Sequence, residues 1–174
     1  MIKHHSKLLP LFLTFTFLLL LSACGSEDPT PQRQKVTVTL GLQGSAATVV
    51  GSVDVDVVLP DGFVLEMDNP SGQPIDTALS LLVSGATFSS NYIPETSIAN
   101  GEIIVGIIKG DGFAGNASLV QISRTYAAGT TLPTADDFIV TVVASDLDGV
   151  PLTDITGQIN IDTEPVPAPA TPPL

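Results

Sequence analysis

The sequence predicts an all-β protein, an antiparallel β-sandwich with about nine strands, behind a cleaved signal peptide. Three observations predict this fold. Short runs of residues alternate between apolar and polar side chains with a period of two, as half-buried strands do. Glycine, proline, asparagine and aspartate cluster between the runs, where turns are needed. No helical periodicity separates the runs, so the βαβ pattern of a parallel sheet is not expected.

The alternation is clearest at the start of the domain, where Val36, Val38, Leu40 and Leu42 are separated by threonine and glycine. The next run places Asp54 and Asp56 together on one face, which we expect to be solvent or a binding surface. The expected strands, in order, are Val36–Leu42, Ser52–Leu59, Phe63–Met67, Leu79–Val83, Ala86–Ser89, Glu102–Ile108, Leu119–Tyr126, Phe138–Ala144 and Gly157–Ile161. The run from Glu102 is apolar on both faces, which is typical of a central strand.

Turns are expected at Pro60–Gly62, Asn69–Gly72, Asn100–Gly101, Asp111–Gly112 and Gly115–Asn116. The one helical signal is Thr134, which has Asp137 three residues later in the arrangement of a capping box. We therefore expect a single helical turn there and no long helix.

The N-terminal segment has the order of a secretory signal: Lys3 and Lys7, an apolar run from Leu8 to Leu21, and then small residues. The run is shorter than the roughly 20 apolar residues of a membrane-spanning helix. It ends in Leu-Ser-Ala-Cys, which resembles the lipobox of bacterial lipoproteins, with Cys24 as the only cysteine of the chain. The resemblance implies cleavage before Cys24 and attachment of acyl chains such as palmitate to it. Two or three chains together anchor a protein stably, because each buried CH₂ contributes about 0.8 kcal/mol.

Four segments follow from these patterns: a signal peptide over 1–23, a flexible tether over 24–34, the β-sandwich over 35–163, and a proline-rich tail over 164–174. The residues after Cys24 are Gly25 and Ser26, which lack the aspartate that retains some lipoproteins at an inner membrane. We therefore expect a lipid-anchored protein of the cell envelope, at the outer membrane.

The composition excludes several functions. After the signal peptide, four basic and 18 acidic residues remain, a formal net charge of −14, which argues against nucleic acid and anionic lipid headgroups as partners. Both histidines, His4 and His5, lie within the signal peptide. The exported domain therefore lacks the residues of a Ser-His-Asp or Cys-His site and of a histidine- or cysteine-ligated zinc site. A hydrolase would need two facing carboxylates, and we expect the acidic residues to lie at turns and on solvated strand faces.

One segment has the residues of a weak metal site. Asp146 and Asp148, followed by Gly149, offer carboxylate oxygens for Ca²⁺, which would be the only cofactor of the chain. The residues after Gly149 lack the further acids of a full calcium loop. A plain Asp-Gly β-turn is therefore the favoured interpretation, and Ca²⁺ is the alternative.

Several segments together resemble cohesin-like domains. They are the early pair of runs from Gly51 to Glu66, the run from Asn100 to Ile108 with the glycine-rich turn after it, the run from Leu119 to Tyr126, and the end from Thr134 to Gly149. The resemblance covers most of 36–162 and implies a jelly-roll sandwich related to carbohydrate-binding modules. Some members of that family hold dockerin modules, and others stand alone on exported proteins.

These expectations combine into a non-catalytic lipoprotein that binds a protein module or an extracellular glycan on one sheet face. A structural envelope protein with no specific ligand is the alternative, and an enzyme is disfavoured. The chain has no tryptophan. Its exported aromatic residues are Phe63, Phe88, Phe113, Phe138, Tyr92 and Tyr126, and the phenylalanines, which lie in strand patterns and near turns, are expected in the core. A glycan would therefore be held by polar hydrogen bonds in a groove and not by an aromatic platform.

Overall fold

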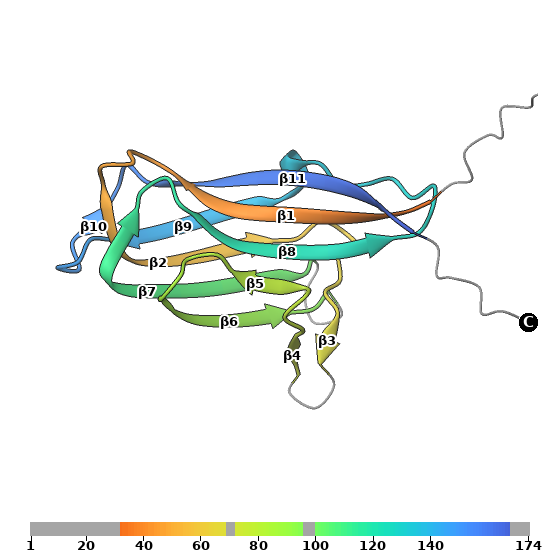
Figure 1. The fold of residues 1–174 in the computed structure, drawn as a ribbon, viewed down its shortest axis with the longest axis horizontal. Helices are drawn as coiled ribbons and strands as arrows, with labels where there is room; N and C mark the ends of the chain where they lie inside the picture. The colour runs from red at the N-terminus through yellow and green to blue at the C-terminus, as the bar shows by residue number, and fades with distance from the viewer. Residues whose placement is uncertain (1–31, 69–71, 96–99, 168–174) are drawn as a thin grey trace, which may run out of the picture. The chain divides into compact units, whose positions relative to one another are not determined.

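The computed structural model describes residues 32–68, 72–95 and 100–167. These residues form two antiparallel β-sheets that pack face to face as a sandwich, so the predicted fold class is confirmed (Figure 1). The signal peptide, the Cys24 anchor site, most of the tether and the tail from residue 168 lie outside the described residues. No helix in the described part of the chain is long and apolar enough to cross a membrane.

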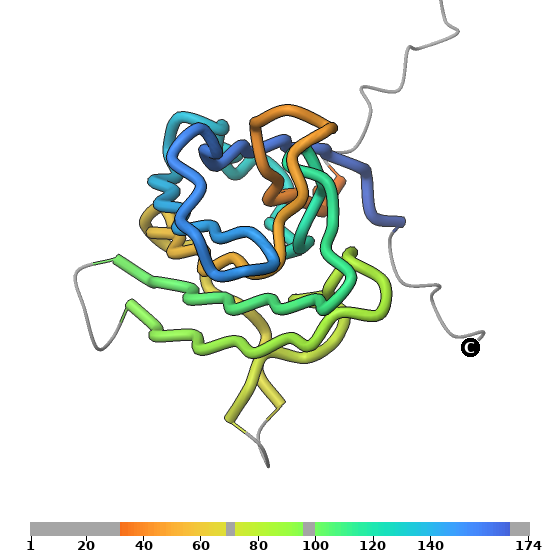
Figure 2. The backbone as a smooth tube through the Cα atoms, turned by 90° about the vertical axis from the view of Figure 1, so that its left-hand side faces the viewer, coloured from red at the N-terminus to blue at the C-terminus, as the bar shows by residue number. Residues whose placement is uncertain are grey.

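The sandwich consists of a four-stranded and a five-stranded sheet. The four-stranded sheet has the order β11 (Thr156–Val166), β1 (Arg33–Gln43), β8 (Ser118–Tyr126) and β5 (Leu79–Leu81). The five-stranded sheet has the order β10 (Pro151–Leu152), β9 (Ile139–Ser145), β2 (Val49–Val58), β7 (Glu102–Ala114) and β6 (Thr87–Ile93). A short hairpin of β3 (Met67–Asp68) and β4 (Gln73–Pro74) projects from the sandwich (Figure 1). Among the nine strands of these two sheets, six of the eight connections between consecutive strands cross from one sheet to the other, as in a jelly roll. Strands β6 and β7 lie on the opposite side of the sandwich from β1 and β11 (Figure 2).

One hydrophobic core fills the space between the sheets. It takes every second residue of the central strands, because successive side chains of a strand point to opposite faces. Val36, Val38, Leu40 and Leu42 of β1 are all at most 1% exposed, as the alternation predicted. Of the phenylalanines expected in the core, Phe63 and Phe138 are buried, whereas Phe88 and Phe113 are only partly buried against it. The ring of Phe63 meets Phe138 edge-on at 5.4 Å and Tyr126 at 6.3 Å between centroids.

The expected strand Phe63–Met67 is wrong for most of its length, since only Met67 and Asp68 pair as a strand. Phe63 and Leu65 are buried as the alternation required. Their backbone groups, however, bond outside any ladder: Phe63 N–H donates to Pro60 O at 2.9 Å, and Leu65 N–H donates to the Tyr92 hydroxyl at 3.3 Å. The segment Phe63–Leu65 is therefore a loop that buries alternate side chains in the core.

The expected turn at Asp111–Gly112 is a bulge inside β7. The β2–β7 register shifts between Val50 and Ser52, so that β7 carries several unpaired residues between Ile108 and Phe113. Gly112 takes a positive φ of 74°, and Lys109 Nζ spans the bulge to Gly112 O at 3.0 Å. The predicted turn is therefore wrong: the chain bulges at Gly112 and continues in the same strand to Ala114.

The strand pair β1–β11 is longer than expected. Arg33 pairs with Val166 and Lys35 with Glu164, so regular pairing extends beyond the predicted domain bounds of 35 and 163. Proline lacks a backbone N–H, and Pro165 is tolerated because β11 is an edge strand, which has no neighbouring strand on its solvent side to bond to. The predicted helical turn is confirmed as a 3₁₀ turn, Ala135–Asp137, whose Asp137 Oδ2 accepts bonds from Thr134 N–H at 2.7 Å and Thr134 Oγ1 at 2.9 Å. These bonds lower the pKa of Asp137.

Candidate functional site

The outer face of the five-stranded sheet carries exposed aliphatic side chains, and we call it the aliphatic face. Its members are Ile104 and Ile108 on β7 and Ile139 and Val143 on β9, which are 39%, 61%, 64% and 62% exposed. Three further exposed aliphatic residues, Val49, Leu147 and Val150, lie at or beside one end of the same sheet. Large apolar side chains grouped on one face are typical of a surface that another molecule covers.

Carboxylates lie among these aliphatic side chains. Asp54 and Asp56 face outward from β2, as expected, with Asp54 beside Gly106 and Asp56 beside Ile104 in the β2–β7 register. Glu102 hydrogen-bonds with Asp56, and this bond, together with desolvation and the Asp56 charge, raises the pKa of Glu102. Asp56 Oδ1 is buried and has no hydrogen-bond partner in the described part of the chain. A cationic group from outside would relieve the repulsion between these two acids.

Gly106 hollows the aliphatic face. An open depression of about 220 Å³ lies over it, bounded by Asp54, Ser89 and Ile108 among others. A Cβ at Gly106 would lie 2.8 Å from Ser89 Oγ and 3.2 Å from Asp54 Oδ1, so any side chain there would fill the depression.

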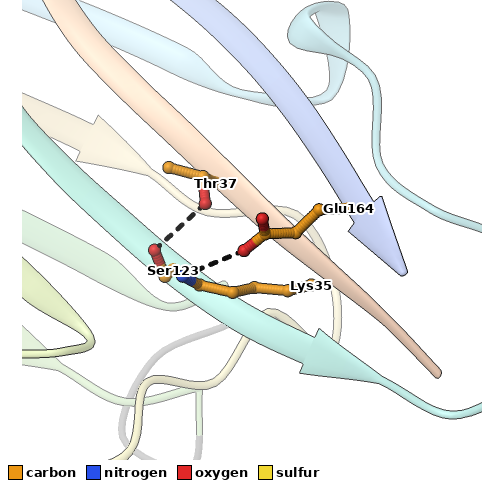
Figure 3. A network of polar contacts seen from close by, with 4 residues as sticks. All are labelled: Lys35, Thr37, Ser123 and Glu164. Atoms are coloured by element: carbon orange, nitrogen blue, oxygen red, sulfur yellow. Dashed lines mark hydrogen bonds and ion pairs between the residues drawn. The ribbon is translucent and has the colours of Figure 1, made fainter. Parts of the chain in front are cut away.

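The outer face of the four-stranded sheet is different, and we call it the polar face. It carries Lys35, Thr37 and Thr39 of β1, flanked by Gln121 and Ser123 of β8 and by Asn160, Asp162 and Glu164 of β11. Thr37 Oγ1 and Ser123 Oγ are 3.3 Å apart, and Lys35 Nζ lies 3.3 Å from Glu164 Oε1 (Figure 3). A groove of about 290 Å³ runs over Lys35, Thr37, Ser123 and Asp162. None of the described aliphatic residues that are strongly exposed lies on β1, β8 or β11, although Leu82 directly follows β5 and its N–H donates to Leu119 O of β8.

The segment from Asp146 to Val150 forms a tight turn in which Gly149 has a φ of 80°. Asp146 Oδ1 accepts bonds from Asp148 N–H at 2.9 Å and from Val150 N–H at 2.8 Å, and Asp146 N–H donates to Val150 O at 2.9 Å. The geometry is that of the favoured Asp-Gly turn. Within residues 32–68, 72–95 and 100–167, no three acidic, histidine or cysteine side chains gather as metal ligands. Ca²⁺ at Asp146 and Asp148 stays a prediction, as does the lipid on Cys24, which lies outside the described residues.

Sequence reasoning missed the chemical difference between the two faces. It identified the outward position of Asp54 and Asp56, but not the aliphatic residues beside them, because β7 and β9 join β2 from distant parts of the chain. The sequence also suggested that Ile104 and Ile108 of β7 were buried, because both faces of that strand are apolar.

Comparisons of the chain with family models, with curated proteins and with solved structures found no match in any of the three. The structure therefore defines this protein by its fold, an all-β sandwich of two antiparallel sheets.

Proposed function

We propose that this chain is a non-catalytic lipoprotein of the cell envelope, anchored by a lipid on Cys24 at the outer membrane, whose cohesin-like sandwich is a binding module. One observation carries the proposal: of the nine large aliphatic side chains that are strongly exposed in the described part of the chain, seven lie on or beside the five-stranded sheet. A partner that covers them would remove this apolar area from water, at about 25 cal/mol per Å².

The chemistry of the aliphatic face favours a protein module as its ligand. Aliphatic side chains of the partner would pack on Ile108, Ile139 and Val143, and one would enter the depression over Gly106. A lysine or arginine of the partner would lie against Asp54, Asp56 and Glu102. In the free protein, Asp56 raises the pKa of Glu102. Complementary charge of this kind mainly supplies specificity and a faster association rate.

A pull-down from the organism's own envelope and secreted fractions tests the proposal, with the full-length chain in nonionic detergent as bait. We expect a partner that the wild-type chain retains, that the Val143→Asp variant loses, and that the Thr39→Asp control on the polar face still retains. A partner retained equally by all three baits contradicts docking on the aliphatic face. Repeating the experiment with Ca²⁺ and with a chelator tests whether binding requires a metal at Asp146 and Asp148.

The second candidate ligand is an extracellular glycan on the polar face. Its support is the row of hydroxyl and amide side chains along β1, β8 and β11, with a groove above them. Side chains of this kind make the hydrogen bonds that a hydroxyl-rich ligand needs, and binding across such a face needs no aromatic platform. If neither a protein nor a glycan binds, the alternative of a structural envelope protein without a specific ligand is preferred.

A further inference from the structure

A pocket opens beside the polar face, at the end of β8. It has a volume of about 380 Å³, and its lining includes Lys35, Glu66, Thr77, Ser123, Arg124 and Thr125. Lys35 and Ser123 also line the groove over the polar face, so the pocket and the groove share a border. The pocket exists because β5 pairs with β8 only up to Ile122, and beyond that point the loop around Val64 to Glu66 borders β8 instead.

Arg124 contributes an unsatisfied donor at this pocket. Its guanidinium carbon lies 4.9 Å from the centroid of the Tyr126 ring, which holds the planar group by a cation–π contact. Its Nη1 is buried and has no hydrogen-bond partner among the described residues. A buried donor without an acceptor costs free energy, and a guanidinium pairs best with a carboxylate or another planar anion.

Basic residues are concentrated at this pocket, although the chain as a whole is strongly acidic. The sequence has only six lysines and arginines, and two of them, Lys3 and Lys7, precede Cys24. Of the other four, Lys35 and Arg124 line the pocket, and Arg33 lies two residues from Lys35 on the same side of β1. Lys35 and Arg124 start from opposite faces of the sheet, because Arg124 pairs with the buried Val36, and both line a pocket that opens at the edge of β8. The carboxylates of Glu66 and Glu164 also lie at this site, but the Lys35–Glu164 pair is exposed and therefore weak, so an anion can compete for Lys35.

We propose that this pocket binds the carboxylate of an acidic sugar, so that the polar face takes a polysaccharide rich in uronic acid. Arg124 and Lys35 hold the carboxylate. The hydroxyls of Thr77, Ser123 and Thr125 bond to ring hydroxyls, and the adjoining groove takes the next sugar along the chain. The inference rests on the glycan candidate for the polar face and names its ligand class.

The experiment is a calorimetric titration of the full-length chain, in nonionic detergent and chelator, with polygalacturonate and with neutral dextran. We expect polygalacturonate to bind and dextran to bind at least about tenfold more weakly. Lys35→Gln and Arg124→Gln should each weaken polygalacturonate binding about tenfold, the effect of losing about 1.4 kcal/mol. The control Lys109→Gln changes net charge equally but lies in the β7 bulge at the opposite end of the sandwich, and it should change affinity less than twofold (Figure 1).

The outcomes separate the inference from the candidate on which it rests. If dextran binds as tightly as polygalacturonate, the glycan candidate stands and the acidic-sugar inference is overturned. If neither polymer binds, both fail. If polygalacturonate binds but the Lys35 and Arg124 variants behave like the Lys109 control, the pocket is not the site. Because Lys35 is exposed, its variant tests the inference even if Arg124→Gln fails to fold.

Discussion

The outer faces of the two sheets differ sharply, although the sheets share one core. The five-stranded sheet presents isoleucine and valine among carboxylates, whereas the four-stranded sheet presents hydroxyl and amide side chains with a lysine–glutamate pair. In both sheets most inward positions are aliphatic, because the core needs apolar side chains. The outward positions are not fixed by that need, and our proposal assigns a different ligand to each face. The largest expected effects therefore lie at inward positions.

Two adjacent residues of β7 test this separation most strongly. Ile103 is fully buried and points inward, whereas Ile104 is 39% exposed on the aliphatic face. Ile103→Ala should lower the free energy of unfolding by about 2–5 kcal/mol, through lost apolar contact and the cavity that remains. Ile104→Ala should lower it by less than about 1 kcal/mol. Urea unfolding followed by circular dichroism measures both, and equal losses would mean that the outward position also serves the fold.

The same alternation explains what the sequence predicts well. Strand β1 was predicted closely, because its four apolar residues alternate without a break and the turn chemistry beyond it is polar. The run from Phe63 has an equally regular pattern, yet most of it is a loop, since burial alone does not decide whether the backbone finds a partner strand. Periodicity therefore predicts which side chains are buried more safely than it predicts pairing.

The candidate sites were harder to predict than the core. Lys35 and Arg124 are 89 positions apart in the sequence, and only the β1–β8 register, which pairs Val36 with Arg124, brings them to one pocket. The one signal in the sequence is the scarcity of basic residues: four lie outside the predicted signal peptide, and two of these line the pocket. Local turns need no such long-range information, which is why the Thr134 capping box was predicted correctly.

Gly41 and Gly51, one at an irregularity in each sheet, should give stability effects of intermediate size. A Cβ at Gly51 of β2, opposite the β7 bulge, would lie 2.6 Å from Asp146 O and 2.9 Å from Leu147 Cα, both backbone atoms. At Gly41, by the irregularity in β1, the nearest atom would be Ala117 O at 3.3 Å. Gly51→Ala should therefore cost about 1–3 kcal/mol of stability, whereas Gly41→Ala should cost under about 1 kcal/mol. Thermal unfolding by calorimetry checks the order, and a reversed order would contradict this account of the bulge.

The carboxylates of the aliphatic face give the comparison a pH dependence. The Asp56 bond raises the pKa of Glu102 in the folded protein, so the folded state binds this proton more tightly than the unfolded chain does. This group therefore lowers stability at neutral pH, and the loss is recovered as pH falls through the raised pKa. Glu102→Gln should raise the unfolding temperature at pH 7, and the advantage over wild type should shrink toward pH 4.

Asp111 provides the control of opposite sign. Its bond with Lys109 lowers the pKa of Asp111, so its contribution is present above the unfolded pKa and is lost as pH falls through the folded pKa. Asp111→Asn should lower the unfolding temperature at pH 7, and its difference from wild type should also shrink in acid. If both variants shift the unfolding temperature in the same direction at pH 7, the repulsion between Asp56 and Glu102 is not the cause.

The smallest effect on stability is expected on the polar face, at the Lys35–Glu164 pair. The two side chains are 40% and 64% exposed and 3.3 Å apart, so water and salt screen their attraction. Lys35→Gln should change the free energy of unfolding by less than about 0.5 kcal/mol, and raising the salt concentration should remove most of that change. A loss above about 1 kcal/mol that persists in high salt would show that Lys35 serves the fold. A small, salt-sensitive loss would instead leave ligand binding as the reason to place a lysine between Thr37, Ser123 and Glu164.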